Sequence, residues 1–364
     1  MNEIDKKILN HICIDYKYNP IYDTTSQHIF EEVGYIPEID KYINGFQEFI
    51  REKIFPFIKD GGTYAARIKS PSVFGVDNPF FTGCDIDIIA SIRDGQIAWG
   101  SHYDQEKSFY NEQCKYVVIK ITAGASNGKQ LMSVLSSNFA HELTHAYDDY
   151  RATINGGTSI ENAAKQSGYQ YRTLTWELGN TKNVKMLGKA LYVLSPMELN
   201  AIIGQIKGEI HALKTSTPQE ALEAIKKTIA YKCYQWLKST IEAINNTDNS
   251  LIKNELLHAY TVWIGYNKNK NKFPGSNYVV RKNLTYEGFL TELNSMFRKW
   301  ERKFLTMVGK IAYKHHVDTS LPLINYSDPD EEVSNKKYEL NEGFEKERTF
   351  TYGVDAYPVD NEKN

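Results

Sequence analysis

The sequence lacks the features that mark several large classes of protein. Its 364 residues include only four cysteines, and no two of them form a CxxC pair. Cysteines so widely spaced predict free thiols in a reducing compartment, not a disulfide framework or a cysteine-rich zinc site. No apolar run reaches the roughly 18 residues that a membrane span requires, and the N-terminus has no secretory-type apolar segment. We therefore expect an aqueous, cytoplasmic protein that does not enter a membrane.

The sequence also lacks an excess of charge of either sign. Lys and Arg total 43, Asp and Glu total 45, and the formal net charge is −2. Such a balance provides no field that attracts nucleic acid, so we expect no nucleic-acid partner. Hydrophobic residues make up 41% of the chain, which is ordinary for a globular protein with a full core.

The hydrophobic pattern predicts an α+β protein with a small mixed sheet. Residues 1–62 have helical spacing, most clearly from Pro37 onward. Four short segments rich in β-branched and aromatic residues follow, and they predict a sheet of three to five strands. These segments are TYAARIK, CDIDIIASI, QIAWGSHY and KYVVIKIT. The turn sequence Arg93-Asp94-Gly95-Gln96 predicts a hairpin between the second and third segments.

Helical periodicity returns from about Ser126 and dominates the rest of the chain. We expect a core of residues 63–213, then a helical part at 214–317 and an acid-rich tail at 318–364. The capping box Thr217-Pro218-Gln219-Glu220 predicts the start of one helix whose hydrophobic stripe continues to Ile241. The tail has too few apolar residues to form a core, so it predicts a segment that a protein partner or a larger assembly holds.

The strongest chemical signal is HExxH at residues 141–145, inside the expected helix. Residues four apart lie on one face of a helix, so His141 and His145 can both direct a ring nitrogen at one zinc ion. Glu142 directly follows His141 on the helix, so its side chain lies close to the zinc without being a ligand. It can act there as the general base on a zinc-activated water that attacks a carbonyl. The spacing therefore predicts a zinc-dependent hydrolase site.

A third protein ligand is required, and the sequence offers three candidates. Glu198, near the start of a later helix, is the best placed of these, and His211 and Asp149 are the alternatives. Ser195-Pro196-Met197-Glu198 is also a capping box, in which Glu198 would only bond to the local backbone. Tyr150 and Arg151 follow the two aspartates, so the longer HExxHxxGxxH pattern of metzincins is absent.

Further polar residues are candidates for supporting roles around the zinc. Asp148 and Asp149 can orient a ligand histidine through its second nitrogen, or they can be solvated charges near the helix end. A zinc hydrolase also needs a donor that stabilises the oxyanion of its transition state. The candidates for this role are His102, Tyr147, Tyr192 and His211.

At these residues the chain resembles known metallopeptidases. HExxH followed by a glutamate on a later helix is similar to the pattern of gluzincins. HELTHAYDDYRA and the Glu198-Leu199-Asn200-Ala201 segment resemble the intermembrane-space peptidases that process an ATP-synthase subunit. The resemblance covers roughly residues 131–202 and implies a zincin-like fold with His141, His145 and Glu198 as zinc ligands. The chain departs from gluzincins at Ile202, where they have an aspartate four residues after the glutamate.

Two functions from different classes are consistent with these patterns. The first is a zinc metallopeptidase that acts on a peptide or protein substrate. Zincin sheets place an edge strand above the catalytic helix, and QIAWGSHY or KYVVIKIT can supply that strand. The second is a structural or interaction protein of a larger assembly, such as a phage virion or tail, that is built on the same fold. Retention of Glu142 favours the first, because a purely structural copy does not need the base.

Overall fold

The structure, a computed structural model, divides into two compact units. It describes residues 36, 38–58, 63–92, 98–105, 107–154, 181–211, 215, 217–268 and 284–317. Within these, a sheet unit comprises the residues from 36 to 154 together with 207–211, and a helical unit comprises the rest. The boundary falls inside a single helix, α8 (Pro196–Ile210). The expected tail at 318–364 lies outside the described residues.

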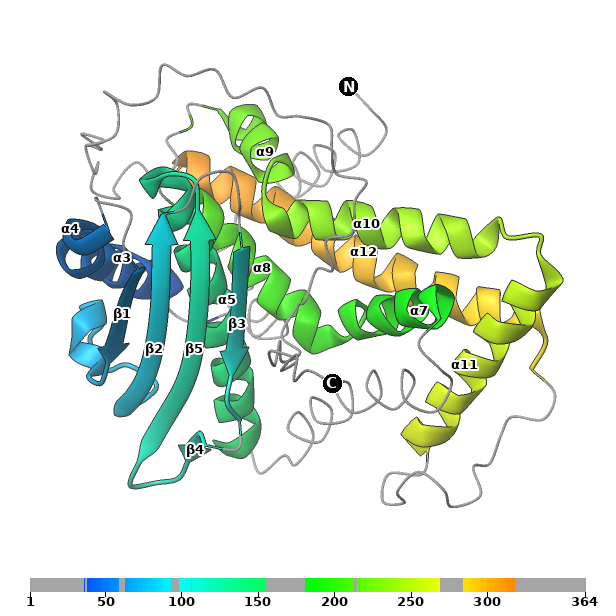
Figure 1. Ribbon diagram of the computed structural model, residues 1–364, viewed down its shortest axis with the longest axis horizontal. Coiled ribbons are helices and arrows are strands. Elements are labelled where there is room, and N and C mark those ends of the chain that lie inside the picture. The colour runs from blue at the N-terminus through cyan, green and yellow to red at the C-terminus, as the bar shows by residue number, and fades with distance from the viewer. Residues whose placement is uncertain are drawn as a thin grey trace, which may run out of the picture. The chain divides into compact units, whose positions relative to one another are not determined.

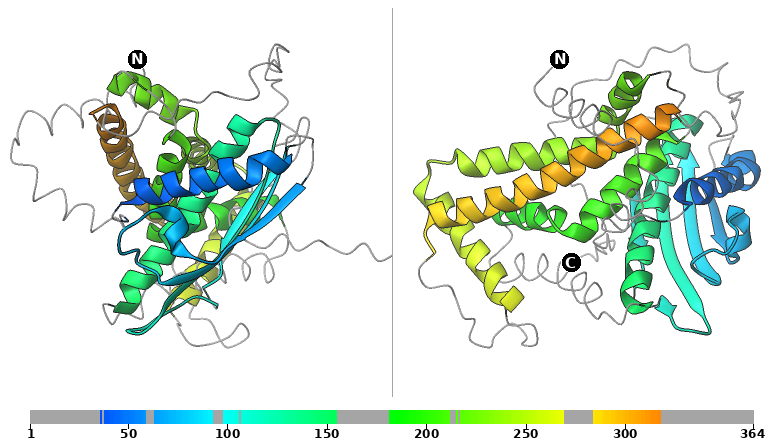
Figure 2. Two further views of the ribbon diagram at one scale, coloured as in Figure 1. Left: turned by 90° about the vertical axis from the view of Figure 1, so that its left-hand side faces the viewer. Right: turned by 180° about the vertical axis from the view of Figure 1, so that it is seen from behind.

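The sheet unit is a mixed five-stranded sheet with helices on one face (Figures 1 and 2). Its strands are β1 (Thr63–Ile68), β2 (Gly83–Ile92), β3 (Ala98–Tyr103), β4 (Phe109–Tyr110) and β5 (Lys115–Ala125). Its helices are α3 (Ile39–Phe49), the π-helix η1 (Ile50–Ile54), α4 (Phe55–Ile58), the 3₁₀-helix η2 (Pro71–Phe74) and α5 (Gly128–Ile154). The chain is therefore a mixed α+β protein, as the sequence predicts.

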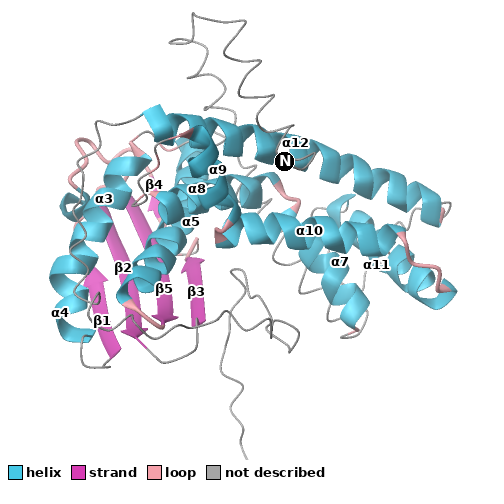
Figure 3. Ribbon diagram, turned by 90° about the horizontal axis from the view of Figure 1, so that it is seen from above, coloured by secondary structure: helices cyan, strands magenta, loops and turns pink. Residues whose placement is uncertain are grey.

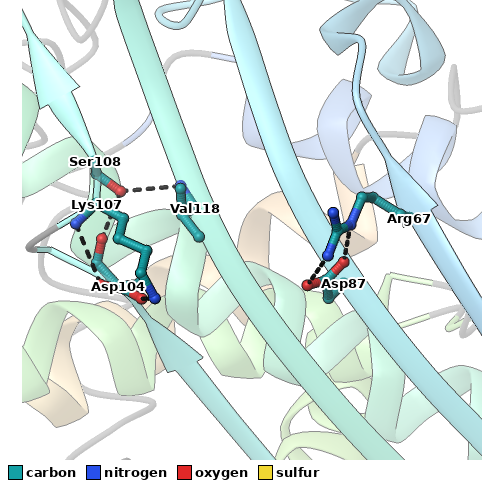
Figure 4. Close-up of polar contacts among 6 residues, drawn as sticks. All are labelled: Arg67, Asp87, Asp104, Lys107, Ser108 and Val118. Atoms are coloured by element: carbon teal, nitrogen blue, oxygen red, sulfur yellow. Dashed lines mark hydrogen bonds and ion pairs between the residues drawn. The ribbon is translucent and has the colours of Figure 1, made fainter.

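Alternation along β2 explains why one face of the sheet is covered and the other is not. Cys84, Ile86 and Ile88 are buried toward the helices, whereas Asp85 and Asp87 point to the outer face. Burying each such isoleucine contributes roughly 2 kcal/mol. On the outer face, the Arg67 guanidinium of β1 donates to both carboxylate oxygens of Asp87 (Figure 4). The outer face is thus a solvated surface with cross-strand ion pairing, typical of a sheet that is covered on one side.

The strand order is β1-β2-β5-β3, with β4 paired to β5. Strand β2 pairs in parallel with β5, and β3 pairs antiparallel with the other side of β5. The predicted hairpin at Arg93–Gln96 is therefore wrong: residues 93–97 lie outside the described residues, but the flanking strands are separated by β5. The physical reason is burial, because β5 carries Val117, Ile119 and Ile121 almost fully buried, whereas β3 (AWGSHY) has no β-branched residue and contains a glycine.

A short turn fixes the end of β3 beside β5. The Asp104 amide donates to the Val118 carbonyl (2.9 Å), and the Val118 amide donates to the Ser108 hydroxyl (2.9 Å) (Figure 4). Inside the turn, the Asp104 carboxylate accepts from the amide and the ammonium of Lys107. These bonds hold β3 in place as the last strand at its side of the sheet.

The helical unit is built from long amphipathic helices (Figure 3). It contains α7 (Lys182–Val193), the first part of α8, α9 (Pro218–Lys226), α10 (Ile229–Asn245), α11 (Ser250–Lys268) and α12 (Tyr286–Val317). An aromatic cluster of Tyr231, Tyr234, Trp300 and Phe304 joins α10 to α12. No helix in the described ranges combines the length and hydropathy needed to cross a membrane.

One helix expected from the sequence is two helices in the structure. The Thr217 hydroxyl accepts from the Glu220 amide, so the predicted cap is present. The helix that it starts ends at Lys226, and Thr228 caps a new helix by accepting from the Tyr231 amide (3.1 Å). The prediction of a continuous helix to Ile241 is therefore wrong, because the hydrophobic stripe continues across the break and hides it.

Candidate metal centre

The HExxH residues lie in the middle of α5, on the side that faces the protein interior. His141 is 5% exposed, Glu142 is 3% exposed, and His145 is half-buried. The Nε2 atoms of the two histidines face each other at 3.2 Å. The motif therefore brings two nitrogen ligands together on one helix face, as its spacing predicts.

Glu198 begins α8, and the bonding around it bears on its two possible roles. The Ser195 hydroxyl accepts from the Glu198 amide (3.3 Å), which is the first half of a capping box. In the second half, the Glu198 carboxylate would accept from the Ser195 amide, but that amide donates to the Tyr192 carbonyl (3.0 Å). The Ser195 amide therefore has a backbone acceptor of its own, and Oε2 of Glu198 is a buried oxygen.

The last part of α8 packs closely on α5. A Cβ atom at Gly208 would be only 2.4 Å from the Ser136 carbonyl oxygen, so the two helix backbones touch at this point. Glu198 lies ten residues before Gly208, or about 15 Å along the helix, whereas His141 lies five residues after Ser136. Gly208 and Glu198 therefore belong to one helix, whose last part is packed directly on α5.

His141, His145 and Glu198 form a group that can hold a metal ion. One ligand atom from each residue lies within 4.8 Å of the other two. With metal–nitrogen bonds of about 2.05 Å, tetrahedral ligands are about 3.3 Å apart, which matches the observed 3.2 Å between the two Nε2 atoms. The residues therefore fit a tetrahedral metal with one remaining position.

Glu142 is held by a residue that the sequence analysis did not identify. The Ser101 hydroxyl of β3 donates to Oε1 of Glu142 at 2.6 Å. The sequence signal for this contact is weak, because a serine in an edge strand has no motif around it. Only the order of the strands shows that β3 lies beside α5.

Asp149 is part of a buried hydrogen-bonded cluster with the same strand. Tyr103 donates to one of its carboxylate oxygens (2.7 Å), and Gln105 donates to the other (3.2 Å). Since Tyr103 gives its only proton to Asp149, Tyr110 must donate to Tyr103 across their 2.9 Å contact. Burial raises the pKa of Tyr103 and of Tyr110 well above the ordinary value, so both remain donors at neutral pH.

Burial and hydrogen bonding bear on the roles that the sequence predicts for Asp148 and Asp149. Asp148 is 3% exposed and Asp149 is 6% exposed, so the alternative of solvated charges is wrong for both. The carboxylate of Asp149 already accepts at both oxygens from residues on the β3 side, which disfavours it as the third metal ligand. Asp149 instead links α5 to the strand.

The structure separates three of the four oxyanion candidates from the metal group. His102 alternates with Ser101 and Tyr103, which face α5, so it lies on the outer face opposite the exposed Lys120. Tyr147 lies two residues past His145 and packs on Phe80 (5.2 Å between ring centroids).

His211 follows the other end of α8, 13 residues or roughly 20 Å along the helix from Glu198. There its ring contacts Asn44 (2.6 Å) and Asp40 (3.8 Å) of α3. This placement also argues against His211 as the third ligand. Tyr192 is half-buried at the end of α7, three residues before Ser195, and its role stays a prediction.

Comparison with known proteins adds no further assignment. No protein-family model, curated protein or solved structure matches this chain. What the described residues establish is therefore a buried His-His-Glu group that can hold a metal ion, next to a buried glutamate, in a mixed α+β protein.

Proposed function

We propose that this protein is a zinc-dependent metallopeptidase of the zincin type. The observation that carries the proposal is the convergence of His141, His145 and Glu198 beside a buried glutamate that is not a ligand. A metal site that serves only structure is normally closed by four protein ligands, whereas three ligands leave a position for water or substrate. The group has the composition of a catalytic site.

Zinc is the metal that suits these ligands best. Two imidazoles and one carboxylate form a mixed set of nitrogen and oxygen ligands, which zinc binds in tetrahedral geometry. Calcium and magnesium favour sites made of oxygen alone, and the set contains no thiolate of the kind that copper(I) or iron–sulfur clusters require.

The protein's own residues then have distinct tasks. Zinc bound there would supply a Lewis acid that makes a water acidic and polarises a substrate carbonyl. The Glu142 carboxylate would then act as the base that takes a proton from the attacking water and returns it to the leaving amine. Burial of Glu142 excludes competing solvent and strengthens its hydrogen bonds.

Strand β3 supports a peptide as the substrate. Among the described residues it pairs only with β5, so its other side offers backbone donors and acceptors to an extended chain. Its inward residue Ser101 contacts Glu142, which places this strand next to the proposed base. Of the two segments expected to form the edge strand, the described part of the first, β3 (Ala98–Tyr103), lies at the edge, and KYVVIKIT, which is in β5, lies in the centre.

The test combines metal analysis with a peptide-cleavage screen. We expect close to one zinc per chain, and hydrolysis that Glu142→Gln abolishes without loss of zinc, because the base is not a ligand. Glu48→Gln is the matched control, since Glu48 is an exposed glutamate on α3. Cleavage by Glu142→Gln at the wild-type rate would exclude the mechanism.

The same measurements distinguish the metallopeptidase from the alternative function, in which a zincin fold is a structural component of an assembly such as a virion. That function predicts bound metal with no hydrolysis of any peptide by the wild-type protein. The tail that would contact an assembly partner, 318–364, lies outside the described residues, and no described residue favours this alternative.

A further inference from the structure

Ser101 stands out because it is the residue of β3 that contacts the proposed base. Its hydroxyl lies 2.6 Å from Oε1 of Glu142, within the range of a short hydrogen bond to a carboxylate. Glu142 is 3% exposed, so water does not compete freely for that oxygen. A hydrogen bond to a charged group in a buried position is stronger than one at the surface.

A glutamate that acts as a base must present one oxygen in a fixed direction. Its side chain has three rotatable bonds, and without a partner the carboxylate samples several orientations. The bond from Ser101 occupies Oε1 and fixes the carboxylate plane. Oε2 is then the oxygen that remains to accept the proton in the reaction.

The strand that carries Ser101 is itself anchored to α5 at a second point. Tyr103, two residues further along β3 and on the same face, donates to Asp149 (2.7 Å). Glu142 and Asp149 lie seven residues apart, which is two helical turns and about 10.5 Å along one face of α5. Two bonds in the same order along strand and helix fix their register, so Ser101 cannot slide away from Glu142.

From this geometry we infer that Ser101 is a positioning residue that orients the Glu142 carboxylate for proton transfer. The inference rests on the proposed function, and it concerns the side chain alone. The Ser101 hydroxyl donates to Glu142 and is not one of the three groups that can hold the metal, and its substitution leaves the backbone of β3 in place. Its loss should therefore lower the rate of the chemical step and leave the affinities for zinc and peptide nearly unchanged.

The variants are Ser101→Ala, which removes the hydroxyl, and Ser101→Thr, which keeps it in a side chain that strands favour. Thr122→Val is the matched control, because it removes a hydroxyl from the exposed outer face of β5. For Ser101→Ala we expect kcat to fall roughly 10- to 100-fold, with KM and zinc affinity within about threefold of wild type. Ser101→Thr should recover most of kcat, and Thr122→Val should behave as wild type.

A second readout does not depend on turnover. A small hydroxamic acid gives its hydroxyl proton to a nearby base when it chelates a metal, so its affinity reports the orientation of Glu142. Calorimetry on zinc-loaded protein should show roughly 10-fold weaker hydroxamate binding for Ser101→Ala, and weaker binding again for Glu142→Gln.

The outcomes distinguish this inference from the function on which it rests. Wild-type protein that takes up no zinc and binds no hydroxamate would overturn the proposed function itself. Zinc-loaded protein in which Glu142→Gln weakens hydroxamate binding but Ser101→Ala does not would overturn only the role of Ser101. Equal loss in Ser101→Ala and Ser101→Thr would also overturn it, because the hydroxyl would not be the cause.

Discussion

Replacing Gly208 by alanine tests whether the contact between α8 and α5 sets the metal geometry. The added Cβ would lie 2.4 Å from the Ser136 carbonyl oxygen, 2.8 Å from its carbon and 2.9 Å from Ser137 Cα. These are backbone atoms, so no side chain can rotate away. Ordinary contact begins near 3.4 Å, and the helices must therefore separate by about 1 Å.

That displacement has two measurable effects. Overpacking of this kind costs about 1–3 kcal/mol, which should appear in denaturant unfolding of the metal-free protein. Metal–ligand distances tolerate only about 0.2 Å, so moving the helix that carries Glu198 should weaken zinc binding by roughly 10- to 100-fold. The zinc affinity is measured by competition with a chromophoric chelator.

Gly45→Ala is the matched control for this experiment. A Cβ at Gly45 would lie 2.4 Å from Phe74 Cα and 2.5 Å from its carbonyl oxygen, which is an equally close backbone contact on α3. We expect a similar loss of stability with zinc affinity within about threefold of wild type. The reasoning would be refuted if both variants lost zinc equally, or if Gly208→Ala lost stability but kept wild-type zinc affinity.

Two further predictions follow from the charges and the buried tyrosines. Glu198→Gln should weaken zinc binding sharply in the chelator competition, because a neutral oxygen replaces a carboxylate. It should barely change the unfolding of the metal-free protein, because the Ser195 hydroxyl still caps the helix. Unchanged zinc affinity would remove Glu198 from the ligand set. Stability should also fall as the pH rises above about 10, because burial raises the pKa of Tyr42 to about 12 and the unfolded chain loses the proton first. Tyr42 alone accounts for about 1.4 kcal/mol per pH unit between those values, and urea unfolding at pH 9 and pH 11 that gave equal stability would contradict this.

Much of the fold was predictable because local patterns decide it. The segment CDIDIIASI alternates buried and exposed residues along β2, and Thr217 caps its helix as its sequence indicates. The order of the strands was not predictable in the same way. A turn sequence favours pairing of its flanking strands, but β5, with its buried row of Val117, Ile119 and Ile121, lies between β2 and β3.

The residues of the candidate site were likewise predictable only where a local sequence pattern specifies them. The pair His141 and His145 follows from helical spacing, since both lie on one helix. Ser101 and Gly208 act through contacts between elements distant in the sequence, and neither has a local motif that reveals its partner. Small residues on α8, Ala201 and the pair Gly204 and Gly208 four residues apart, are a sequence signal that this helix can pack closely on another.

The strand order also has a consequence for how the sheet unit assembles. Its four longer strands form two antiparallel pairs, β1 with β2 and β3 with β5, joined by one parallel seam between β2 and β5, and the short β4 also pairs with β5. The partners across the seam are 33 residues apart throughout, from Gly83 with Tyr116 to Ile92 with Ala125, whereas Tyr103 and Ile119 of the second pair are 16 apart. Contacts between distant residues form slowly, so each antiparallel pair should form before the seam closes. In pulsed hydrogen exchange during refolding, amides of the β2–β5 seam should gain protection last, and earlier protection there than in β1–β2 would contradict this order. On this pathway β3 and its serine join the sheet together with β5, as one preformed pair.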